Sequence, residues 1–135
     1  MRVLVVVVLA LGVVSCGAES DYANKPRPPA PISVTAAIDK TRIRVSPATF
    51  GGGPVTFIIS NQSGAEQKVT FESDGSKNGG IRRATGKIEP RSTANLKVDA
   101  PEGTYTLSAS GENVAPATIE VSTRRRSSQN DLLLP

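Results

Sequence analysis

Residues 53–61 read Gly-Pro-Val-Thr-Phe-Ile-Ile-Ser-Asn, and this stretch decides the fold class. Large apolar side chains stand at every second position, from Val55 through Phe57 to Ile59. A period of two places alternate side chains on opposite faces of a β-strand. Turn-forming residues flank the run, since Gly-Gly-Gly-Pro leads into it and Asn-Gln-Ser-Gly ends it. The stretch therefore predicts a strand with one buried face.

The same alternation recurs throughout residues 32–123. Further runs have their apolar residues at Ile32/Val34/Ala36/Ile38, Ile43/Val45, Val69/Phe71, Ala94/Leu96/Val98, Tyr105/Leu107/Ala109 and Ala117/Ile119/Val121. Gly, Pro, Asn and Asp separate these runs, and no helical stripe of useful length appears. Seven to eight short strands with this spacing predict an all-β fold, an antiparallel Greek-key β-sandwich.

Three motifs in this region resemble the cupredoxin family. Residues 53–61 form a strand that ends in Asn, residues 66–71 read Glu-Gln-Lys-Val-Thr-Phe, and residues 101–107 read Pro-Glu-Gly-Thr-Tyr-Thr-Leu. The resemblance covers roughly residues 32–123. It implies a cupredoxin-like sandwich, and an immunoglobulin-like sandwich is the alternative within the same fold class.

The copper ligands of that family are missing from the matching positions. Gln67 stands where the family has its first copper-binding histidine, and Ala109 stands where it has the cysteine. The 135-residue sequence contains no histidine and one cysteine, whereas a blue-copper site needs two histidines and a cysteine thiolate. We therefore expect no metal site, no copper electron transfer and no histidine-based catalysis.

The N-terminal segment has the layout of a secretory signal. Arg2 precedes an apolar run over residues 3–14, which is shorter than the roughly 20 residues of a membrane-spanning helix. Residues 13–16, Val-Val-Ser-Cys, resemble the lipobox of bacterial lipoproteins. The resemblance implies that Cys16 carries a covalent diacylglyceryl group, whose two acyl chains suffice for stable anchoring. A secreted protein with a stray cysteine is the alternative.

These features divide the chain into four parts. We expect a lipoprotein signal peptide over residues 1–15, a lipidated N-terminus and proline-rich linker over 16–31, the β-sandwich over 32–123, and a basic and apolar tail over 124–135. The linker prolines favour an extended spacer, with a PxxP ligand as the alternative. The whole layout resembles small actinobacterial lipoproteins. It predicts lipid anchoring on the extracytoplasmic face of the cell membrane.

The net charge of +4 is unevenly distributed. Residues 32–123 contain ten basic and nine acidic side chains, so the excess comes largely from Arg124, Arg125 and Arg126. Aromatic residues make up 4% of the chain, which leaves few platforms for base stacking. Both observations argue against a nucleic-acid partner.

Two basic segments supply the candidate binding residues. They are the glycine-bearing stretch 73–88 and the tail, with Lys77, Arg82, Arg83, Lys87, Arg124, Arg125 and Arg126. Candidate partners are an anionic envelope polymer, the membrane surface or an extracytoplasmic protein. A solvated loop and a frayed terminus are the alternatives. An even number of reversing strands would return the tail to the anchored end.

Two weaker motifs do not change this interpretation. Oxygen-bearing side chains between Glu72 and Asn78 resemble a calcium loop, but Arg83 stands where an EF-hand has its bidentate glutamate. The Gly-Gly-Gly run at 51–53 lacks the Lys-Ser/Thr pair of a phosphate loop, so a flexible strand entry is favoured.

The sequence favours a non-enzymatic function, since no motif assembles a catalytic group. We expect a membrane-anchored extracytoplasmic lipoprotein that serves as a binding or envelope-associated module. An accessory subunit or sensor for an extracytoplasmic protein is the first alternative, and a cell-envelope hydrolase is the second.

Overall fold

The computed structural model describes residues 27–75 and 80–127, and within them the chain forms eight β-strands. These are β1 (Ile32–Ile38), β2 (Ile43–Ser46), β3 (Thr49–Asn61), β4 (Val69–Ser73), β5 (Arg82–Ala84), β6 (Thr93–Ala100), β7 (Gly103–Ala109) and β8 (Ala117–Arg124). None of the described residues belongs to a helix long and apolar enough to span a bilayer. The prediction of an all-β fold with seven to eight strands is confirmed.

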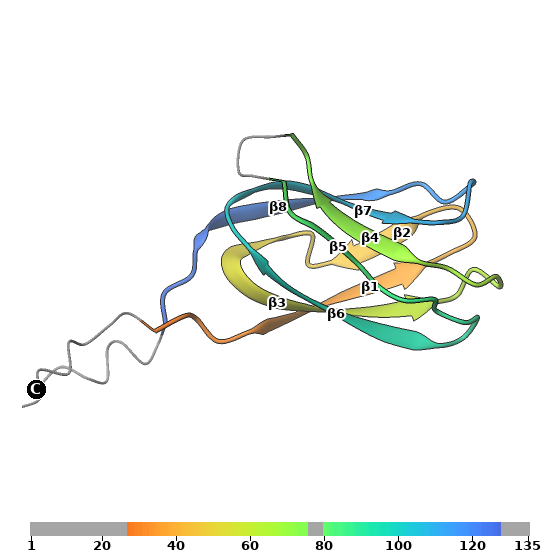
Figure 1. Ribbon diagram of the computed structural model, residues 1–135, viewed down its shortest axis with the longest axis horizontal. Helices are drawn as coiled ribbons and strands as arrows, with labels where there is room; N and C mark the ends of the chain where they lie inside the picture. The colour runs from red at the N-terminus through yellow and green to blue at the C-terminus, as the bar shows by residue number, and fades with distance from the viewer. Residues whose placement is uncertain (1–26, 76–79, 128–135) are drawn as a thin grey trace, which may run out of the picture.

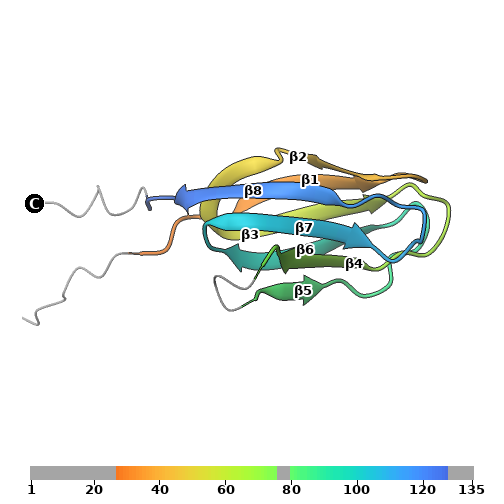
Figure 2. The same ribbon diagram turned by 90° about the horizontal axis from the view of Figure 1, so that it is seen from above.

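The strands form two layers that share one strand, as Figures 1 and 2 show. The first layer has the order β2-β1-β3-β6. The second layer has the order β3-β8-β7-β4-β5. Strand β3 belongs to both layers because its beginning pairs with β8, whereas its later part, from Gly53 onward, pairs with β6 and β1.

Two of the strand pairings are parallel, namely β1 with β3 and β3 with β8. This corrects the expectation of antiparallel pairing throughout. Strand β3 curls over in its first half, and its remaining part, from Val55 onward, then runs beside β1 in the same direction (Figure 1). Alternation with period two shows which side chains are buried, but it carries no information on strand direction.

The curl of β3 lies at the Gly-Gly-Gly run 51–53. The register with β8 shifts between Gly51 and Gly52, which marks a bulge where that pairing ends. Gly53 has a φ of +127°, and a Cβ atom there would lie 2.8 Å from Cγ of Pro29. Only glycine adopts this backbone conformation without strain. The run is therefore the point where one strand passes between the layers.

The core lies between the layers and contains a row of aromatic rings. Centroids are 6.2 Å apart for Phe50 and Phe57, 5.3 Å for Phe57 and Phe71, and 4.6 Å for Phe71 and Tyr105. All four side chains are buried. Because Phe57 comes from the part of β3 in the first layer and Phe71 from β4 in the second, the row joins the two layers.

Strand β5 was not predicted, and it lies inside the stretch 73–88 that the sequence indicated as a loop. Its three residues are all exposed, so no apolar alternation marks them. Arg83 pairs with Phe71 across the ladder and therefore lies on the same side of the sheet as that buried ring. A short edge strand with an inward charge resists the addition of further strands.

The chain enters β1 and leaves β8 at the same end of the sandwich (Figure 1). There, Nη1 of Arg125 donates a hydrogen bond of 2.9 Å to the carbonyl oxygen of Ala30. We call this the linker end and define it by residues 29–31, 51–54 and 124–127. The distal end consists of the turns 39–42, 61–68, 85–92 and 110–116. The tail thus starts where the linker meets the domain, as an even strand count predicts.

Candidate functional site

A buried polar side chain connects the turns of the distal end. Nδ2 of Asn61 donates to the carbonyl oxygens of Ala65 at 2.7 Å and Ile88 at 2.8 Å. Its Oδ1 accepts from the backbone N of Ser63 at 3.0 Å and from the hydroxyl of Ser63 at 2.8 Å. Asn61 has no exposed surface. The amide therefore joins the end of β3 to two turns and has no group left for a ligand.

Gln67 makes a second bridge across the distal end. Its Oε1 accepts hydrogen bonds from the backbone N of Gly111 at 2.9 Å and from the hydroxyl of Ser110 at 3.3 Å. Its Nε2 donates to the hydroxyl of Ser63 at 3.3 Å. The side chain is 4% exposed. This amide connects the turn 61–68 with the turn 110–116.

The structure separates the basic residues predicted for the stretch 73–88. Nε of Arg82 lies 3.8 Å from a carboxylate oxygen of Glu72, while Arg83 lines an open hollow of about 440 Å³ together with residues of β3 and β6. Lys87 forms a 2.9 Å ion pair with Glu66. That hydrogen bond raises the pKa of Lys87 and lowers the pKa of Glu66, although both groups are exposed. Lys77 lies outside the described residues.

Arg125, which the sequence analysis predicted to be a binding residue, instead makes hydrogen bonds to the backbone within the domain. Nε donates to the carbonyl oxygen of Gly51 at 2.9 Å and Nη2 donates to that of Pro54 at 2.7 Å, in addition to the bond from Nη1 to Ala30. The backbone N also donates to Gly52. Arg125 thereby ties the linker and the curl of β3 to the end of β8.

The other two arginines of the tail lie on the surface. Nη1 of Arg124 is 3.3 Å from a carboxylate oxygen of Asp99, and 52% of the Arg124 side chain is exposed. Arg126 is exposed as well. Cys16, the predicted lipidation site, lies outside the described residues. Within residues 124–127, the described part of the tail, Arg124 and Arg126 are therefore the arginines that a partner can reach most easily.

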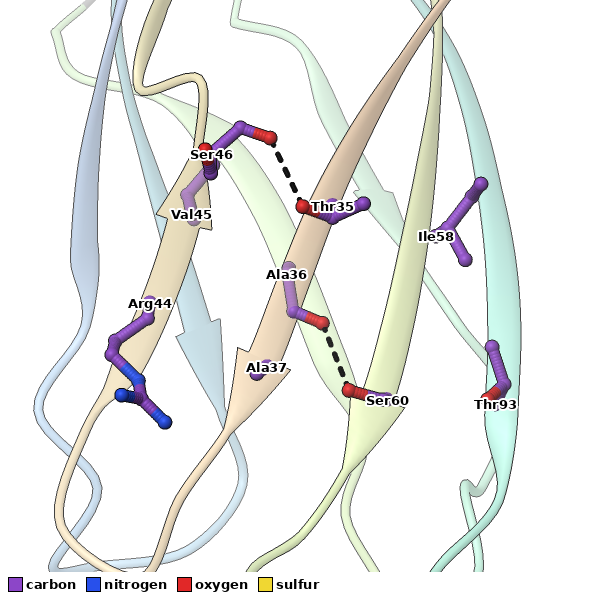
Figure 3. A pocket seen from close by; sticks show the side chains of 9 residues that line it. All are labelled: Thr35, Ala36, Ala37, Arg44, Val45, Ser46, Ile58, Ser60 and Thr93. Atoms are coloured by element: carbon purple, nitrogen blue, oxygen red, sulfur yellow. Dashed lines mark hydrogen bonds between the residues drawn. The ribbon is translucent and has the colours of Figure 1, made fainter.

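A shallow hollow of about 310 Å³ lies on the outer face of the first layer (Figure 3). It is lined by Thr35, Ala36, Ala37, Arg44, Val45, Ser46, Ile58, Ser60 and Thr93. The strand register places Ile58 between Thr35 of β1 and Asn95 of β6, so small polar residues surround it. Ile58 is 38% exposed, and it is the one large apolar residue exposed on the described surface.

The hollow does not assemble catalytic groups. Its one charged lining residue, Arg44, forms a 2.9 Å ion pair with Asp39. The hydroxyl of Thr35 donates to the carbonyl oxygen of Ser46, and that of Ser60 donates to Ala36 (Figure 3). These hydroxyls thus connect neighbouring strands, and the hollow as a whole suits contact rather than chemistry.

Comparison with known proteins places the fold. The sequence matches no protein-family model and no curated protein. The structure resembles auracyanin A, a blue copper protein from the green thermophilic photosynthetic bacterium Chloroflexus aurantiacus, with a TM-score of 0.56 and 13% identity over 69% of this chain and 100% of that one. The fold is cupredoxin-like. Auracyanin B gives a TM-score of 0.51 at 14% identity, covering 71% of this chain and 91% of its own.

The residues of this cupredoxin-like domain do not fit a copper ion. The oxygen and nitrogen of the Gln67 amide are hydrogen-bonded within the protein, and Ala109 offers no donor atom. Across residues 27–75 and 80–127, no three His, Cys, Asp or Glu side chains lie together in a group that could hold a metal ion. The domain thus combines a fold similar to that of a copper protein with a distal end whose turns are connected by the side-chain amides of Asn61 and Gln67.

Two functional roles in the fold were missed at the level of sequence. Asn61 was noted as the end of a strand and the start of a turn, but not as a buried bridge between turns, although an Asn side chain that bonds the backbone two residues on is typical of an Asx turn. The role of Arg125 had no such signal, because its partners lie 71 to 95 positions away in the sequence.

Proposed function

We propose that this protein is a bacterial lipoprotein of the small actinobacterial type, anchored by lipid on Cys16 at the extracytoplasmic face of the cell membrane. Its cupredoxin-like domain then serves as a non-catalytic binding or envelope-associated module. Two observations support the proposal, namely the lipobox in the sequence and the position of the linker end in the fold.

The observation that carries the proposal is the hydrogen bond between Arg125 and Ala30. It fixes the last residues of the linker beside the start of the tail. Ten residues lie between Cys16 and Arg27, so the eleven Cα-to-Cα steps reach at most roughly 40 Å when fully extended. A tether attached at this end leaves the distal end and both outer sheet faces accessible to partners.

Lipidation is tested in cells that are fed labelled palmitate. We expect the full-length chain to take up the label and to sediment with membranes. The Cys16→Ala variant should lose both properties, and the Ser15→Ala variant, which keeps a small residue before the cysteine, should retain them. An unlabelled wild-type chain, or a Cys16→Ala variant that remains equally membrane-bound, would overturn the anchor.

The hollow around Ile58 favours a second candidate function, an accessory subunit or sensor that contacts an extracytoplasmic protein. An apolar residue surrounded by small polar residues resembles the centre of a protein interface. A photoreactive amino acid at position 58 should form protein adducts in intact cells. The same amino acid at exposed position 118, on β8 of the second layer, should not. Equal adducts from both positions, or none from position 58, would argue against this function.

A further inference from the structure

We propose that the linker end docks on an anionic lipid surface through Arg124 and Arg126. The inference rests on the lipid anchor proposed above and adds an orientation of the domain on the membrane. It follows from how the structure holds the three consecutive arginines of the tail.

The middle arginine of the run fixes the positions of its two neighbours. Arg125 is bonded through its side chain to the carbonyl oxygens of Ala30, Gly51 and Pro54. Its neighbours Arg124 and Arg126 are both exposed. Two surface guanidinium groups therefore stand where the linker leaves the domain on its way to Cys16.

The charges around these arginines allow an anionic headgroup to bind. Arg124 is paired with Asp99, whose side chain is 59% exposed, and such surface pairs are weak and screened by salt. The partners of Arg125 are carbonyl oxygens, so its positive charge adds to that of its neighbours. Asp99, together with Glu102 and Asp74 in turns at the same end, supplies three negative charges. Arg27 and residues 124–126 supply four positive charges, so the net charge remains positive.

Because the domain is tethered to the membrane, a weak electrostatic contact is sufficient to hold it in one orientation. Two arginines at an anionic surface favour the docked orientation by roughly thirty-fold. An untethered domain would dissociate from so weak a contact, but a short linker keeps the effective concentration of the surface high. Because the linker end lies at one end of the long axis (Figures 1 and 2), docking would direct the distal end away from the bilayer.

The orientation is measured on the full lipidated chain in vesicles. Cys16 is the one cysteine of the sequence and is consumed by lipid, so an Asn113→Cys substitution in an exposed distal turn accepts a single fluorescent dye. Energy transfer is recorded to acceptor-labelled lipid headgroups in phosphatidylcholine vesicles, with and without phosphatidylglycerol. We expect lower transfer on the anionic vesicles, and the difference should disappear at high salt.

Matched variants distinguish docking through Arg124 and Arg126 from a general effect of the net charge of the domain. Arg124→Gln combined with Arg126→Gln should restore the transfer seen on neutral vesicles. Lys40→Gln combined with Arg42→Gln removes the same charge from exposed positions at the distal end and should leave the difference intact. Equal transfer on both vesicle types, or equal effects of the two double variants, would overturn the docking proposal. A chain that fails to bind neutral vesicles would instead overturn the anchor.

Discussion

Arg125 donates a hydrogen bond to Ala30 across 95 positions of the sequence, with an Nη1-to-oxygen distance of 2.9 Å. The same guanidinium bonds to the curl of β3, so one side chain joins the linker, the shared strand and the end of β8. Its planar geometry supplies several donors in fixed directions, which an ammonium group cannot reproduce.

Arg125→Lys should therefore destabilise the domain by about 2 kcal/mol, because partly buried carbonyl groups lose their donors. Thermal unfolding measures the loss, and hydrogen exchange should quicken at the backbone amide of residue 125, which donates to Gly52. Arg126→Lys, a matched change at an exposed position, should alter stability by less than about 0.5 kcal/mol. Equal effects of both variants would contradict the structural role of Arg125.

Gly53→Ala should destabilise the domain by about 2 kcal/mol or more. The substitution forces a side chain into a φ of +127° and against Pro29, whose Cγ lies 2.8 Å from the new Cβ position. Gly64→Ala is the control, since Gly64 has a φ of +86° and no atoms within 4 Å of a Cβ. Gly64→Ala should lower the free energy of unfolding by about 1 kcal/mol. Identical losses in chemical denaturation would show that the contact with Pro29 contributes nothing.

Asn61→Ala should cost about 3 kcal/mol, because the carbonyl oxygens of Ala65 and Ile88 would lose a buried donor. Hydrogen exchange should increase in the turns 61–68 and 85–92 and remain unchanged at the linker end. Asn95→Ala, on the exposed outer face, is the matched substitution and should change the unfolding free energy by less than about 0.5 kcal/mol. A loss that small at Asn61 would refute its role in connecting the turns.

Tyr105 should titrate above the ordinary tyrosine value of 10.0. Burial raises its pKa, and the negative charge of Asp99 raises it further. A raised pKa favours the protonated form in the folded state, so this contribution to stability is complete below about pH 10 and is lost as pH rises through the folded-state pKa. Phenolate absorbance of a Tyr22→Phe variant isolates Tyr105. A midpoint at or below 10.0 would contradict the burial argument.

Alternation of residues predicted most of the fold, and its failures have physical causes. The run from Val55 to Ile59 and the six like it are all strands, and their alternate apolar residues are buried or partly buried. Strand β5 was missed because Arg82–Ala84 buries nothing, and the start of β3 was missed because a glycine run has no side chains to alternate. The parallel pairings were missed because the alternation of apolar residues is the same for parallel and antiparallel strands.

The candidate site was less predictable than the fold. Placing Gln67 at the position of a metal ligand needed only its spacing from the Val-x-Phe strand. Its amide bridges to Ser110 and Gly111 through hydrogen bonds that span 43 and 44 positions of the sequence, and these depend on how β4 pairs with β7. The division of the tail into one internal arginine and two surface arginines likewise depends on where β3 curls, which no local pattern indicates.

The passage of β3 between the layers has a consequence for how the domain melts. A sandwich with separate sheets can lose one sheet while the other persists, but here each sheet would lose a strand if the other opened. The aromatic row crosses the same boundary. Heat should therefore disrupt the whole domain in one cooperative step, with calorimetric and van't Hoff enthalpies in agreement.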